Sequence, residues 1–105
     1  MKQFTIFTIA ILISVFSFAQ DDRYFSAMEK GIGMISNERQ PVAEWQAAAN
    51  YFERIANAES EKWLPKYYFG YCNMMMALAE YQNKGEFEQY LDKAQEAVEA
   101  AMALA

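Results

Sequence analysis

The sequence contains no histidine and only one cysteine, Cys72. Without histidine, the chain cannot use a histidine general base, a serine–histidine pair or a histidine metal site. A lone cysteine cannot form an internal disulfide, and the uncharged stretch around it, residues 67–79, favours burial as a small apolar side chain. We therefore predict no catalytic residue, no metal site and no cofactor.

β-Branched residues are also scarce after residue 19, where alanine alone occurs fifteen times. This composition disfavours strands and favours helices. Turn-forming residues at 37–41, 57–65 and 83–85 then divide the chain into four segments. The β-branched residues are Ile32, Ile35, Val42, Ile55 and Val98. The predicted helices are 22–36, 41 or 42–58, 64 or 65–82, and 86–104. We expect an all-α fold of four antiparallel helices that form two stacked helical hairpins in a single domain, residues 20–105.

Short links define the hairpins. The link Asn83-Lys84-Gly85 predicts an antiparallel pair of the third and fourth helices, with Gly85 in the left-handed conformation of a helix end. The first and second helices are expected to pair in the same way. Gly31 and Gly33 should weaken the first helix, because each glycine costs about 1 kcal/mol relative to alanine in a helix.

The third predicted helix is apolar around most of its circumference, so it needs two neighbours and should lie at the centre. Its remaining arc contains Lys66, Asn73 and Glu80, bordered by Phe69 and Met76, and is predicted to face solvent. Phe69, Asn73 and Met76 are the candidate partner-binding residues, because an amide beside two apolar side chains could hold a peptide backbone. The alternative is that Asn73 is merely solvated and Phe69 packs under the first helix.

The N-terminal segment 1–19 has the pattern of a secretory signal peptide. Lys2 precedes an apolar stretch, residues 4–16, and Ser17-Phe18-Ala19 offers small residues at the cleavage positions, so cleavage is predicted after Ala19. A retained membrane anchor is the alternative, but residues 4–19 are shorter than the roughly 20 residues that span a bilayer. We expect a periplasmic or secreted protein that meets the membrane only through the signal peptide before cleavage.

Acidic residues outnumber basic residues in the predicted mature chain. The whole chain has 9 Lys and Arg against 14 Asp and Glu, and removal of Lys2 gives a net charge of 8 minus 14, or −6. Nucleic acid and anionic lipid are poor partners for this sign. The charge is not concentrated in a run, so it indicates solubility rather than a site.

Two chemical hypotheses are weaker than their structural alternatives. Met74, Met75 and Met76 beside Cys72 could suggest a cuprous site, but consecutive helical residues point about 100° apart and their sulfurs cannot converge. The carboxylate pairs Asp21–Asp22 and Glu59–Glu61 are expected on open chain rather than across a cleft, and are therefore predicted to be solvated.

Three short patterns resemble the tetratricopeptide repeat family, in particular small exported bacterial proteins with degenerate repeats. Ala48 and Phe52 match the alanine and aromatic positions of the second helix of a repeat, where Ile55 replaces a small residue. In the last helix Ala94, Val98 and Ala101 match the same positions except for the valine, and Phe69-Gly70 resembles the leucine–glycine pair of a first helix.

The spacing of these patterns departs from the family. Ala48 and Ala94, the equivalent alanines of the two hairpins, are 46 residues apart, whereas the tetratricopeptide period is about 34 residues. Longer α-solenoid repeats have periods near 40–47 residues, which is closer to this spacing. The resemblance implies a non-enzymatic interaction or scaffold module whose partner is a protein, a peptide or a second copy of the chain. The alternative is a carrier of a small apolar ligand between the second and third helices, lined by Trp45, Phe52, Tyr68 and Met75.

Overall fold

Helix-forming segments and turns alternate along residues 21–105, which are the residues that this computed structural model describes. Residues 21–34 are helical, and three further helices follow: α2 (Val42–Ala58), α3 (Trp63–Ala79) and α4 (Lys84–Leu104). No strand occurs within 21–105, so the all-α prediction is confirmed for this part of the chain. The predicted signal peptide, 1–19, with cleavage after Ala19, lies outside the described residues. None of the helices in 21–105 is both long enough and apolar enough to cross a membrane.

The helix boundaries lie within two residues of the predicted ones, except at the end of α3. Helix α2 begins after Pro41, as expected. Helix α3 ends at Ala79, three residues before the predicted end, and Asn83 caps α4 by accepting a hydrogen bond from the Glu86 backbone N at 3.3 Å. Gly85 therefore lies inside the first turn of α4. The predicted left-handed glycine is wrong, since no glycine in residues 21–105 has a positive φ.

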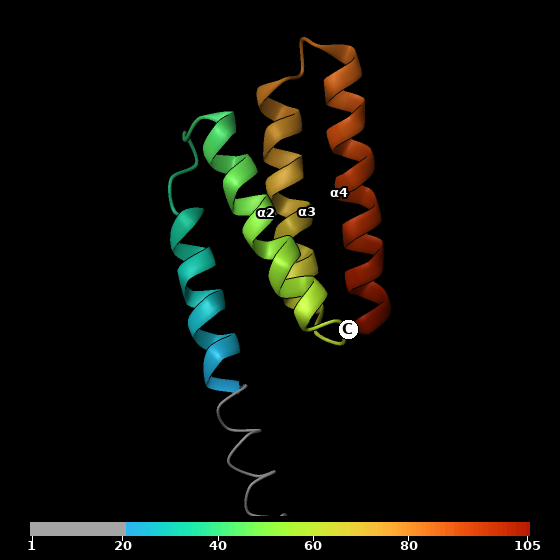
Figure 1. Ribbon diagram of the computed structural model, residues 1–105. Coiled ribbons are helices and arrows are strands. Elements are labelled where there is room, and N and C mark those ends of the chain that lie inside the picture. The colour runs from blue at the N-terminus through green and yellow to red at the C-terminus, as the bar shows by residue number, and fades with distance from the viewer. Residues whose placement is uncertain (1–20) are drawn as a thin grey trace, which may run out of the picture.

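Helix α3 lies between α2 and α4 and packs along both of them, as Figure 1 shows. The helix formed by residues 21–34 lies on the other side of α2, and α4 is at the edge of the row. The prediction that the third helix is central is confirmed. Its position matters for function, because α3 forms the floor of any groove that has α2 and α4 as its walls.

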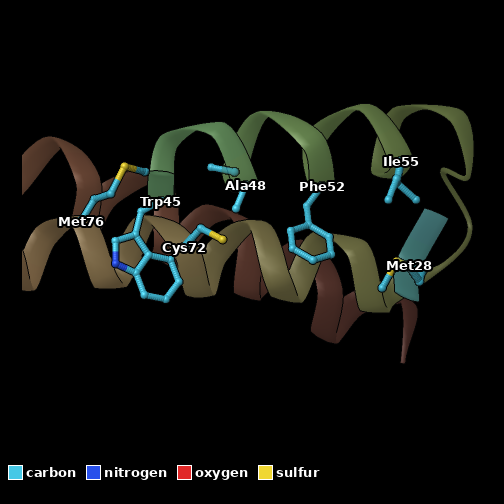
Figure 2. Packing of buried hydrophobic residues seen from close by; sticks show 8 residues of the cluster. Met28, Trp45, Ala48, Phe52, Ile55, Cys72 and Met76 are labelled. Carbon is cyan, nitrogen blue, oxygen red and sulfur yellow. The ribbon is translucent and has the colours of Figure 1, made fainter. Parts of the chain in front are cut away.

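Large side chains fill the space between the first helix, α2 and α3 (Figure 2). The Phe52 ring stacks on Tyr68 with centroids 5.1 Å apart, and Trp45 meets Tyr71 edge-on at 5.8 Å. Such aromatic pairs stabilise a core beyond the area that they bury. The buried members of this cluster are Met28, Trp45, Ala48, Ala49, Phe52, Ile55, Cys72 and Met76.

Small residues instead form the contact between α3 and α4. The buried residues of α4 are Ala94, Ala97 and Ala101. Gly70 of α3 lies so close to them that a Cβ atom there would sit 3.2 Å from the Ala94 carbonyl oxygen and 3.3 Å from the Ala97 Cβ. The absence of a side chain at Gly70 therefore allows the two helices to approach closely.

This close approach overturns the predicted solvent-facing arc of α3. Asn73 and Met76 are buried, with only 2% and 0% of their surfaces exposed, while Lys66, Phe69 and Glu80 are partly buried. The arc faces the neighbouring helices because α4 packs against the side of α3 that carries Gly70. The bulky side chains of a different stripe remain exposed instead: Trp63, Tyr67, Met74, Leu78 and Tyr81.

Candidate functional site

A groove with a mixed polar and apolar lining runs between α2 and α4, which form its walls, and α3 forms its floor. Its volume is about 460 Å³. We call it the α2–α4 groove. Its lining residues are Gln46, Asn50, Glu53, Ala56 and Asn57 of α2, Lys66, Phe69 and Asn73 of α3, and Lys93, Glu96, Ala97 and Ala100 of α4.

The α2 wall presents amide side chains along one face of the helix. Gln46, Asn50 and Asn57 follow one another at intervals of four and seven residues, which places them above one another on the helix surface. The Gln46 Nε2 donates a hydrogen bond to the Asn50 Oδ1 at 2.9 Å, so these two amides hold each other in place. The wall from Gln46 to Asn57 is about 16 Å long at 1.5 Å per residue.

The floor of the groove combines an aromatic ring and an amide with the side chain of Lys66. Phe69 is partly buried and Asn73 is almost completely buried, yet both line the groove. The Asn73 Nδ2 donates a hydrogen bond to the Phe69 carbonyl oxygen at 2.9 Å, one turn earlier in α3. This bond fixes the orientation of the Asn73 amide and satisfies one of its two donor hydrogens.

The charges of the groove balance. Lys66 and Lys93 lie on α3 and α4, and Glu53 and Glu96 lie on α2 and α4, so the lining carries two groups of each sign. A groove with this balance does not select an anion or a cation by net charge. Its amides instead offer donors and acceptors of the kind that a peptide backbone requires.

The part of the chain that the structure describes contains no metal-binding cluster beside the groove. Within residues 21–105, no group of three or more cysteine, aspartate or glutamate side chains lies close enough to hold a metal ion. The single cysteine, Cys72, is completely buried, and desolvation raises the pKa of its thiol to about 12. A thiol in this environment stays protonated at neutral pH, and its predicted role as an apolar core residue agrees with this burial.

The structure separates the three predicted partner-binding residues. Phe69 and Asn73 line the α2–α4 groove, where a bound segment would touch Phe69 first. Met76 does not line it; its side chain is buried in the core cluster with Trp45 and Cys72 (Figure 2). The assignment of Met76 to a solvent-facing surface is therefore wrong, because the helix face that carries it packs against α2.

The groove walls are the part of the site that the sequence did not reveal. The polar residues Gln46, Asn50, Glu53 and Asn57 share one side of α2, but nothing in the sequence places Lys93 or Glu96 opposite them. The repeated amides on one face of α2 are the signal that could have identified this wall.

The comparisons with known proteins do not assign the chain to a family. No protein-family model matches it, and neither the curated proteins nor the solved structures include a significant match. The function is therefore inferred from the site itself.

Proposed function

We propose that this protein is an exported, non-enzymatic interaction or scaffold module, built from tetratricopeptide-like helical hairpins, that binds a segment of a protein partner. The proposal rests mainly on the α2–α4 groove, which three helices enclose and which four amide side chains line: Gln46, Asn50, Asn57 and Asn73. The predicted signal peptide would place this interaction in the periplasm or outside the cell.

The dimensions of the groove suit an extended peptide. A wall of about 16 Å accommodates roughly five residues at about 3.3 Å per residue. The bound backbone would pair with the amides, while one apolar side chain of the peptide would rest on Phe69 and the methyl groups of Ala56 and Ala100. This arrangement would use both the amide side chains of the groove and the apolar patch formed by Phe69, Ala56 and Ala100.

The packing favours this module over the alternative carrier of an apolar ligand. The carrier requires space between Trp45, Phe52, Tyr68 and Met75. Instead, Phe52 and Tyr68 stack directly on each other, and Trp45 and Phe52 are almost completely buried by their neighbours. An apolar ligand would have to displace these contacts.

A blocking substitution in the groove tests the proposal. Ala100 is exposed and lines the groove, whereas Ala103 is exposed on the same helix and does not. We expect heptapeptides selected from a random display library to bind the protein. The Ala100→Arg variant should lose at least about tenfold in affinity for these peptides, equivalent to about 1.4 kcal/mol. The Ala103→Arg variant should bind them as tightly as the unmodified protein does.

Fluorescence anisotropy with the selected peptides measures these affinities, and circular dichroism verifies that both variants remain folded. If no peptide is selected, or if Ala100→Arg and Ala103→Arg bind equally well, the α2–α4 groove is not the binding site.

A further inference from the structure

A second surface of α3 and α4 is apolar rather than polar. The exposed large side chains of α3 follow one another at intervals of four, seven and four residues, so they form one stripe along the helix, and Tyr81 lies in the turn directly after it. Leu91 of α4 is exposed beside this stripe. We call this surface the outer face, and its exposed members are Trp63, Tyr67, Met74, Leu78, Tyr81 and Leu91.

The outer face contains a hollow as well as protruding side chains. The hollow lies where Gly70 and Ala94 bring the two helices together, and Tyr67, Met74 and Leu91 rise around it. Among residues 21–105 no charged side chain lines it, and the remaining lining residues are Tyr71, Gln95 and Val98. A surface that combines knobs and a hollow of the same chemistry can be complementary to itself.

The size of the outer face matches the requirement of a dimer. The six members of the outer face are 37–66% exposed. If each side chain has an area of about 200 Å², together they expose roughly 500–600 Å² of largely apolar surface. A stable interface takes about 800 Å² from each partner, of which about 65% is apolar in homodimers. The outer face supplies this apolar portion and leaves the polar remainder to the rim. It also lies near the upper limit of the apolar patches that monomers expose.

We propose that the outer face binds the outer face of a second copy of this chain, and that the two copies form a dimer with twofold symmetry. In such an interface each residue contacts the symmetry-related surface of the other copy, so Met74 and Leu91 of one copy enter the hollow at Gly70 of the other. The proposal does not depend on the α2–α4 groove, which different residues line, so either one can fail without the other.

The charges beside the outer face predict how salt affects the dimer. Glu88, Asp92 and Glu99 lie within one turn of the Leu91 and Gln95 positions on α4, and all three are exposed. Two copies bring these like charges towards each other, so higher salt should strengthen the association by screening their repulsion. A basic partner on the same face would show the opposite dependence.

A matched pair of substitutions tests the dimer. Met74 lies in the outer face and Ile32 lies on the first helix, and each is 42% exposed. The protein is isolated after any natural processing, and mass spectrometry determines its N-terminus. Light scattering then measures its mass in solution at protein concentrations from about 1 to 200 µM. We expect a dimer that strengthens with salt, a loss of affinity of at least tenfold in Met74→Glu, and no change in Ile32→Glu.

Disulfide trapping gives an independent measurement. Gln95 lines the hollow, whereas Gln89 is exposed elsewhere on α4, and the native Cys72 is too deeply buried to compete. Under mild oxidation Gln95→Cys should form a disulfide-linked dimer at least tenfold faster than Gln89→Cys. A protein that remains monomeric at the highest concentration, a dimer that survives Met74→Glu, or equal trapping rates for the two cysteine variants would each overturn the proposal.

Discussion

The two contacts of α3 are built from opposite kinds of residues. Aromatic rings and methionine side chains pack between α3 and α2, whereas glycine and alanine form the contact between α3 and α4. Burial of large side chains gives the first contact most of its free energy, since each contributes about 1.5–3 kcal/mol. The second contact depends on the close approach of two backbones, and therefore on the absence of side-chain atoms at Gly70. Loss of volume should damage the first contact, and gain of volume should damage the second.

Truncation in the aromatic contact should have the largest effect on stability. Phe52 is completely buried and stacks on Tyr68, so Phe52→Ala leaves a cavity and should lower the free energy of unfolding by about 3–5 kcal/mol. Urea denaturation followed by circular dichroism measures the change. Phe25 is 67% exposed and provides the control: Phe25→Ala should change the value by less than about 0.5 kcal/mol. Equal losses in the two variants would contradict the description of this core.

Enlargement at Gly70 should have the next largest effect. A Cβ atom there would lie 3.1 Å from the Val98 Cγ2, and the nearby Ala94 carbonyl oxygen belongs to the backbone and cannot move aside easily. We expect Gly70→Val to lower the free energy of unfolding by about 1–3 kcal/mol, as overpacking does in other cores. An unchanged urea midpoint would show that α4 adjusts its position without cost, and that small side chains are not required in this contact.

Alkaline pH should weaken the aromatic contact through Cys72. Desolvation raises the pKa of the buried thiol from 9.0 to about 12, so the unfolded chain loses this proton first as the pH rises. The thiol's contribution to stability is complete below pH 9 and disappears progressively between pH 9 and 12. At pH 10 the free energy of unfolding should be lower by about 1.4 kcal/mol than at neutral pH.

A Cys72→Ala variant isolates this proton in urea titrations at pH 7, 9 and 10. Its stability should depend less steeply on pH than that of the unmodified protein. Burial also raises the pKa values of Tyr24 and Tyr71, so the variant should retain a weaker dependence of the same sign. Identical pH profiles would mean that the thiol is solvated.

Two glycines of the first helix should give the smallest effects, of opposite sign. A Cβ atom at Gly31 would lie 2.7 Å from the Phe52 ring, whereas nothing lies within 4 Å of a Cβ at Gly33. Gly33→Ala should raise the free energy of unfolding by about 0.5–1 kcal/mol through helix propensity alone. Gly31→Ala should lower it by about 1 kcal/mol, because the contact with Phe52 outweighs that gain. Changes of the same sign, measured by urea denaturation, would contradict this difference.

The sequence predicts the fold better than it predicts the site. Helix α2 has both of its predicted ends, the burial of Cys72 follows from its uncharged surroundings, and the scarcity of β-branched residues excludes strands over 21–105. These features depend on local composition and on turn residues. They could be predicted from the sequence without knowing which helices pack against each other.

The sequence could not predict which side of α3 faces each neighbouring helix. Apolar residues surround most of this helix, so its hydrophobic pattern gives no direction, and the few polar residues suggested the wrong solvent-facing side. The orientation follows from the fit of Gly70 against Ala94 and Ala97, residues more than twenty positions away. The α2–α4 groove depends on that same fit, because α4 supplies one of its walls.

The alanine contact of α4 also predicts where local opening of the molecule should begin. Ala94, Ala97 and Ala101 bury little surface, so α4 should separate from α3 at a lower free energy than α2 does. Amide hydrogens of α4 would then exchange with deuterium ahead of those in α2. We therefore expect the edge of the molecule to open more readily than its aromatic centre.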